Sequence, residues 1–215
     1  MTVTVQPSRL PGILGLSGVV AIAVGAGLVL LLQFLPGTAQ ISPLRRTISE
    51  YGLSSNKWIF NLALLLIAVG SAALFTLQAL HRGLPVAALV AGAVWTLSLL
   101  VIVAFPKTDW ATGPSPGGTV HRIASIIGFV VLPVGLLIAS GRVFTGETGW
   151  QWAARILALA SLAWFAVILA GVVVMLAGGG PWWTFVPLGL VQRLMALTEL
   201  LAVATLAVPL LRSSG

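Results

Sequence analysis

Six apolar runs, each about 20 residues or longer, limit the folds open to this chain more than any other feature. A helix needs about 20 mainly apolar residues to cross the hydrocarbon core of a bilayer. Lipid offers no hydrogen bonds to the backbone, so a spanning segment is either a helix or part of a closed barrel. Runs of this length predict an all-α integral membrane bundle of six transmembrane helices, with residues 1–215 as a single transmembrane domain. The expected spans are about 11–35, 58–80, 85–105, 120–140, 150–177 and 188–211.

The composition excludes several other classes of protein. The chain is 59% hydrophobic and 7% charged, whereas a soluble domain is about 25% charged. The basic residues are scattered singly, so we expect no nucleic-acid partner. There is no cysteine, and the two histidines are predicted to lie on opposite membrane faces, which argues against a zinc site. We therefore expect no metal and no cofactor.

Six spans place both termini on one side of the membrane. The connections 36–57, 106–119 and 178–187 then share the opposite side, which we call the loop face. In the longest connection, Ser42 is suited to cap a helix, Pro43 to begin it and Gly52 to end it. We therefore predict a short amphipathic helix over 43–51, lying at the membrane interface.

The basic residues give no clear orientation. The terminus side carries five of them: Arg9, Arg82, Arg142, Arg155 and Arg212. The loop face carries six: Arg45, Arg46, Lys57, Lys107, Arg122 and Arg193. Both acidic residues of the loop face could pair with some of these cations and remove them from the positive-inside count. On that basis we predict cytoplasmic termini, in a multi-pass protein of the cell (plasma) membrane.

Three titratable residues are predicted to meet at the loop face. Glu50 lies in the first long connection, Asp109 follows the third span, and His121 opens the fourth. Imidazole titrates near neutral pH, so a histidine and a carboxylate together suit general acid–base catalysis. The alternative is structural: Arg45 or Arg46 would pair with Glu50, and Lys107 or Arg122 with Asp109, so that the charges lock the loops together.

Glu199 is the fourth catalytic candidate. It lies near the middle of the sixth span, about 16 Å from Leu188 at ~1.5 Å per residue. An acidic group at that depth costs on the order of 2.5–3.5 kcal/mol. We therefore expect Glu199 to point into the bundle, protonated or bonded to another helix. It would form the floor of a cavity leading to Asp109 and His121, or else serve only as a neutral packing residue.

Six further side chains are predicted to bind a ligand. Ser49 would donate a hydrogen bond or act as a nucleophile, Arg122 would stabilise charge, and two tryptophans would line the apolar end. The set is Ser49, Arg122, Arg193, Gln192, Trp95 and Trp164.

Several local patterns resemble one family. PLRRTISEYG, NKWIFNLALLL, AFPKTDW and GGTVHRIAS are similar to the family catalogued as domain of unknown function 998. That resemblance implies a small bacterial or archaeal membrane protein of roughly six spans, and it covers most of the chain. It also implies that Ser49, Glu50, Asp109 and His121 form one site, but it brings no activity.

These features lead to three functional hypotheses. The first is a polar pocket at one membrane face that binds membrane lipids or another lipid-like or isoprenoid-like amphiphile, with possible acid–base chemistry on a prenyl chain or a head group. The second is a non-catalytic accessory or assembly subunit with a membrane protein partner. The third is a small transporter, although paired broken helices and a clear repeat are absent from the sequence.

Overall fold

The computed structural model describes residues 10–212, which form helices and no strand. Six helical segments there are long and apolar enough to cross a membrane, which confirms the predicted all-α six-span bundle. Five are single helices: α1 (Leu10–Leu31), α2 (Lys57–Arg82), α3 (Val86–Ala104), α4 (Pro116–Val143) and α5 (Thr148–Leu176). The sixth consists of α7 (Leu188–Thr205) and α8 (Val208–Arg212), and a short α6 (Trp182–Phe185) precedes it. Arg9, counted above on the terminus side, lies outside the described residues.

The helix bounds differ from the predicted spans where local chemistry starts or stops a helix. α4 begins at Pro116, earlier than expected, because the Ser115 hydroxyl accepts a bond of 3.0 Å from the Gly118 N–H and proline fits the first helical turn. The sixth span is interrupted between α7 and α8, just before Pro209, which has no N–H to continue the ladder. The amide of Gln78 on α2 donates to the Leu206 carbonyl at this interruption.

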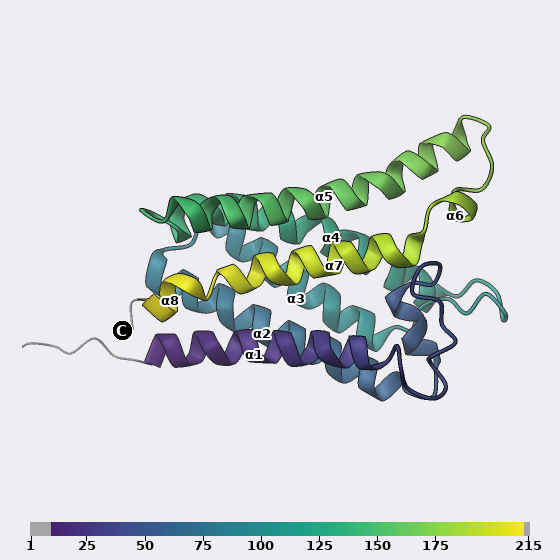
Figure 1. Cartoon of the computed structure of the whole chain (residues 1–215), viewed down its shortest axis with the longest axis horizontal. Helices are drawn as coiled ribbons and strands as arrows, with labels where there is room; N and C mark the ends of the chain where they lie inside the picture. Colours follow the sequence, from purple (N-terminus) through teal and green to yellow (C-terminus); the bar gives the residue numbers. More distant parts are fainter. Residues whose placement is uncertain (1–9, 213–215) are drawn as a thin grey trace, which may run out of the picture.

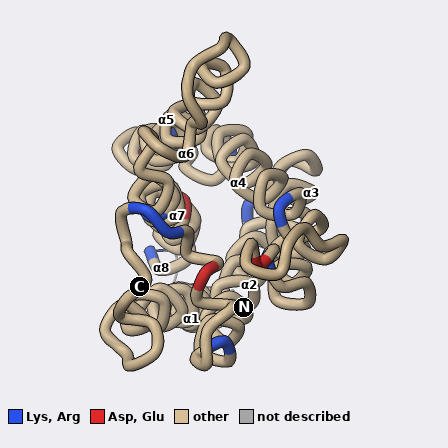
Figure 2. Tube along the Cα trace, turned by 90° about the vertical axis from the view of Figure 1, so that its right-hand side faces the viewer, with Lys and Arg blue, Asp and Glu red and all other residues tan. Residues whose placement is uncertain are grey.

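The helices form a ring around the bundle axis, as Figure 2 shows from the loop face. α1 packs mainly on α2, α3 on α4, and α7 on α5. α8 lies against α1 at the terminus end of the bundle, whereas α1 and α7 diverge towards the loop face (Figure 1). The start of α1 and the end of α8 lie at the same end of the molecule (Figure 1), as an even number of spans requires.

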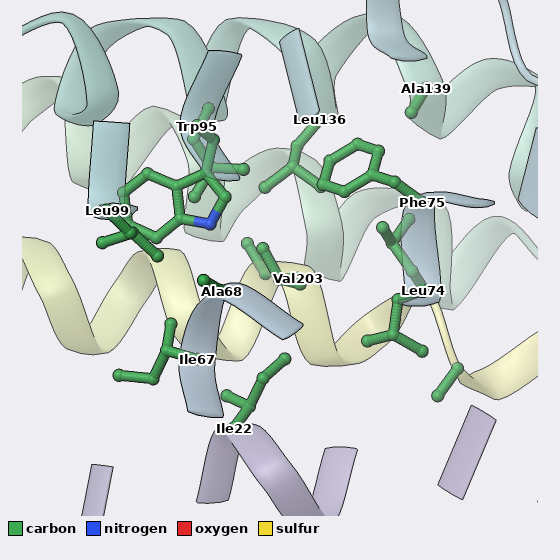
Figure 3. Packing of buried hydrophobic residues seen from close by; sticks show 14 of the residues in the cluster. Ile22, Ile67, Ala68, Leu74, Phe75, Trp95, Leu99, Leu136, Ala139 and Val203 are labelled. Carbon is green, nitrogen blue, oxygen red and sulfur yellow. The ribbon is translucent and has the colours of Figure 1, made fainter. Parts of the chain in front are cut away.

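Close helix contacts leave no room for larger side chains at several glycines. A Cβ atom on Gly25 of α1 would lie 2.7 Å from the Ala63 carbonyl oxygen of α2. A Cβ atom on Gly70 of α2 would lie 2.5 Å from the Gly18 carbonyl oxygen of α1. Small residues let membrane helices approach this closely. Larger side chains such as Phe75, Trp95 and Leu136 then fill the interior (Figure 3).

A short helix is present in the first long connection, as predicted, but its bounds and its type differ from the predicted helix over 43–51. The structure instead has a 3₁₀ helix, η1 (Ile48–Leu53), after a turn in which the Ser42 carbonyl accepts from the Arg46 N–H at 2.9 Å. In an independent α-helix, the backbone carbonyls of this segment would accept hydrogen bonds from N–H groups of the same helix. Here the carbonyls of Pro43, Leu44 and Arg46 accept bonds from α7 instead.

Candidate functional site

A cavity of about 500 Å³ lies inside the helix ring. Its walls come from α1, α2, α3, α4 and α7, and η1 contributes to the end at the loop face. Cavities that bind small ligands usually measure about 300–1,000 Å³ and are mostly apolar. The size and the position of this cavity make it the candidate site.

The cavity has a polar end and an apolar end. The polar lining residues are Gln33, Ser49, Ser125, Gln192 and Arg193. Phe60, Leu64 and Ile67 of α2, with Trp95 and Leu99 of α3, are among the apolar ones. Along α7 the lining runs from Gln192 to Leu200, about 12 Å at ~1.5 Å per residue. The cavity thus starts at the loop face and reaches less than halfway across a hydrocarbon core of about 30 Å.

The cavity is open towards the membrane between α1 and α7. Leu30 of α1 and Leu197 of α7 both line it, yet their side chains are 65% and 52% exposed. The two helices are separated near the loop face (Figure 1), and α7 packs mostly on α5. We call this opening the α1–α7 gap.

Four of the predicted ligand-binding residues line the cavity: Ser49, Trp95, Gln192 and Arg193. Trp95 is buried, and its indole N–H donates to the Ser71 hydroxyl on α2 at 3.2 Å. This bond fixes the ring as part of the apolar wall, which leaves its face for contact with a hydrocarbon chain.

Glu50 does not line the cavity. Its carboxylate oxygen Oε1 lies 2.6 Å from Nζ of Lys107 and 3.8 Å from Nη1 of Arg46. Nζ of Lys107 also donates to the Thr47 hydroxyl at 3.3 Å. These contacts tie η1 and the preceding turn to the connection after α3, as in the loop-locking alternative, except that Lys107 pairs with Glu50 and not with Asp109.

Asp109 lies in an exposed turn away from the cavity. Its Oδ1 accepts from the N–H of Ala111 at 3.0 Å, and its carbonyl accepts from the N–H of Gly113. The carboxylate therefore stabilises its own turn. Arg122 is exposed and has no ion pair with any residue in the described part of the chain.

His121 is buried beside the cavity without lining it. Its Nδ1 lies 2.7 Å from the Phe105 carbonyl oxygen, and because a carbonyl only accepts, Nδ1 carries the proton. Nε2 is buried with no partner within residues 10–212. One turn later, Ser125 lines the cavity and donates to the His121 carbonyl at 2.9 Å. The imidazole N–H thus satisfies the Phe105 carbonyl at the C-terminal end of α3, which would otherwise lack a hydrogen-bond partner.

Glu199 faces α5 and not the cavity. It is fully buried, and its Oε1 accepts a bond of 3.0 Å from the Ser161 hydroxyl. The other oxygen, Oε2, has no partner in the described range. The expected contact with a polar group of another helix is present, but Glu199 is not part of the cavity lining, and neither is Trp164.

Gln192 and Arg193 hold the first long connection against α7. Oε1 of Gln192 accepts from the Ile48 N–H at 2.7 Å. Nη1 of Arg193 donates to the carbonyls of Pro43 at 3.0 Å and Arg46 at 2.8 Å. This contact needs a glycine at 189, where a Cβ atom would lie 2.5 Å from the Arg46 carbonyl oxygen.

A chain of hydrogen bonds crosses the α1–α7 gap at the loop face. Nη2 of Arg193 donates to the Tyr51 hydroxyl at 3.0 Å, and that hydroxyl donates at 2.7 Å to Oε1 of Gln33, which lies in the turn just after α1. We call these three residues the polar bridge. Sequence reasoning missed Gln33 and Tyr51, although Gln33 is a polar residue at the end of an apolar run and Tyr51 is the chain's single tyrosine.

Metal binding has no support from the geometry. Within residues 10–212, no group of three His, Asp or Glu side chains is placed to hold an ion. The groups that face the cavity instead suit hydrogen bonding at one end and hydrocarbon contact at the other.

Comparison with known proteins identifies a family. A family model described as a protein of unknown function (DUF998) matches residues 18–209, which includes all residues of the cavity wall. No curated protein and no solved structure gives a match.

Proposed function

This chain belongs to the DUF998 family of proteins of unknown function, and we propose that it binds a lipid-like or isoprenoid-like amphiphile in the cavity between α1, α2, α3, α4 and α7. The observation that carries the proposal is the polarity of this cavity. Its polar residues gather at the loop face, and its apolar walls extend into the membrane interior. An amphiphile has the same division, with a head group at the interface and a chain in the hydrocarbon.

The α1–α7 gap supports the same proposal because it provides a lateral route. A ligand that dissolves in the bilayer can reach the cavity from the leaflet at the loop face without crossing water. Leu30 and Leu197 form the apolar rim of this route. The polar bridge lies at the loop-face end of this route, where the head group of a bound amphiphile would be in contact with water.

Binding, and not acid–base catalysis, is the activity that we propose. The four catalytic candidates Glu50, Asp109, His121 and Glu199 are all absent from the cavity wall. A general acid or base has to come within hydrogen-bond reach of the reacting atom. We further propose that the protein resides in the plasma membrane with cytoplasmic termini, so that the ligand comes from the outer leaflet.

Native mass spectrometry of the gently solubilised protein, followed by lipid extraction, tests the proposal. We expect an amphiphile retained at a stoichiometry of about one per chain. A protein that carries only a variable set of bulk lipids would contradict the proposal. A copurified protein partner without bound amphiphile would instead favour an accessory subunit.

A cavity-filling variant tests whether the ligand binds in this cavity. Gly27 lies on the cavity wall of α1, and a Cβ atom there would meet no atom within 4 Å. The Cβ of Gly27→Phe would therefore be accommodated, and its ring should fill part of the α1–α7 gap and abolish retention of the amphiphile. Gly141→Phe is the matched control, because Gly141 of α4 also has open space around it but lies outside the cavity lining.

A further inference from the structure

We infer that the ligand of this cavity carries an anionic head group, a phosphate or a carboxylate, and that Arg193 is the residue that recognises its charge. This inference deepens the proposed function and depends on it. It follows from the charge of Arg193, from the kind of hydrogen-bonding groups left at the polar end, and from the charge balance of the loop face.

Arg193 has no acidic partner. It is half-buried and lines the cavity, and its guanidinium bonds only to neutral oxygens: three carbonyls, of Pro43, Arg46 and Gly189, and the Tyr51 hydroxyl. All ion pairs within residues 10–212 involve other cations. A charge that is partly removed from water is costly unless an opposite charge compensates for it. An anionic head group in the cavity would supply that compensation.

The groups that remain free at the polar end are donors. Arg193 has five N–H groups, and no bond in the described range uses its Nε. The amide nitrogen Nε2 of Gln192 and the Ser49 hydroxyl also have no hydrogen-bond partner there. No aspartate or glutamate lines the cavity. Three donors and no carboxylate favour a ligand with several acceptor oxygens.

The loop face as a whole is positively charged. It carries six Lys and Arg residues and two acidic residues, Glu50 and Asp109, and Figure 2 shows these charges around the ring. Glu50 is already paired with Lys107 and Arg46. Basic residues near a membrane surface attract anionic lipids. The same field would concentrate an anionic amphiphile at the α1–α7 gap.

Three probes with the same oleoyl chain separate head-group charge from chain binding. They are oleoyl lysophosphatidic acid, oleate and monooleoylglycerol, titrated against the full chain in phosphatidylcholine nanodiscs and counted by native mass spectrometry. We expect one or both anionic probes to bind at least about tenfold more tightly than the neutral one, as a charge-assisted hydrogen bond would give. The stronger of the two anionic probes distinguishes a phosphate from a carboxylate.

Variants of Arg193 test its role. Arg193→Gln should remove the preference for anionic probes, and Arg193→Lys should retain most of it. Tyr51→Phe controls for the contact with η1, because it removes the bond to Arg193 and leaves the charge; the preference should remain.

A second substitution keeps every bond of Arg193. Ser49→Asp places a negative charge at the polar end and should also remove the preference, whereas Ser49→Asn should not. This pair keeps the inference testable if Arg193→Gln does not fold.

The outcomes separate the two proposals. Equal binding of all three probes, all lost in Gly27→Phe, would overturn the anionic head group and leave the proposed amphiphile site intact. An anionic preference unchanged in both Arg193→Gln and Ser49→Asp would overturn the role of Arg193. Absence of binding by every probe would overturn the inference together with the proposed function.

Discussion

Arg193 of α7 donates from Nη2 to the Tyr51 hydroxyl at 3.0 Å and lies 5.7 Å from the centre of the same ring. One side chain of α7 therefore contacts both the polar and the aromatic part of a residue from η1. Tyr51 is 1% exposed, and its hydroxyl continues the bridge to Gln33, just after the end of α1. Through Tyr51, the polar bridge connects α7 with the segment just after α1 across the α1–α7 gap at the loop face.

Tyr51→Phe should weaken this link without emptying the site. The ring and its packing remain, but the Arg193 and Gln33 side chains lose a shared partner, at a cost of about 1 kcal/mol for each bond. We expect a lower melting temperature and faster hydrogen exchange in residues 36–57. Unchanged exchange in that segment would show that the bridge does not hold it.

Gly189→Ala should detach the first long connection from α7. The new methyl group would lie 2.5 Å from the Arg46 carbonyl oxygen and 2.6 Å from that of Pro43, which is closer than real side chains approach. The bonds from Arg193 to these carbonyls should break, and limited proteolysis should cut within 36–57. Gly27→Ala is the matched control, because its methyl group has open space; it should resist the protease as the parent chain does.

The pair formed by Ser161 and Glu199 predicts that a second substitution restores stability lost in the first. Ser161→Ala removes the one hydrogen bond that we find for the Glu199 carboxyl group, which is fully buried, and should cost about 1–3 kcal/mol. The double variant Ser161→Ala/Glu199→Leu removes the polar group as well and should be more stable than Ser161→Ala alone. Thermal unfolding in detergent measures both, and a double variant less stable than Ser161→Ala would contradict the explanation.

The absence of cysteine from the chain allows the proposed orientation to be tested directly. Ala111 on the loop face and Thr145 on the terminus side are both exposed. With cytoplasmic termini, Ala111→Cys should react with a membrane-impermeant maleimide on intact cells. Thr145→Cys should react only after permeabilisation, and the reverse pattern would invert the topology.

The spans could be predicted because lipid forces every long apolar run into a helix that satisfies its own backbone. The conformation of 43–51 could not, because its backbone groups bond to Leu190, Gln192 and Arg193, far away in the sequence. Local helix propensity cannot predict these hydrogen bonds, because their partners come close to 43–51 only in the folded chain.

Which residues line the cavity depends on how each helix is rotated about its own axis, and hydropathy does not determine that rotation. His121 and Ser125 are one turn apart on α4, and only Ser125 lines the cavity. On α7, Ala196 and Leu200 line it, while Glu199 turns towards Ser161 of α5. Sequence reasoning expected Glu50 and His121 near the connection after α3, where both are found. It did not resolve the rotation of each helix about its own axis, and less than half a turn separates a lining residue from a packing one.

The hydrogen bonds from α7 to the first long connection are made to backbone groups of that connection. Arg193 binds the carbonyls of Pro43 and Arg46, Leu190 donates to the carbonyl of Leu44, and Gln192 accepts from the N–H of Ile48. Every residue type has the carbonyl and every type except proline has the N–H, so these four contacts do not depend on the side chains of Pro43, Leu44, Arg46 and Ile48. Substitutions at these positions, including Ile48 in the cavity wall, can therefore reshape the entrance to the cavity while the backbone contacts with α7 are kept.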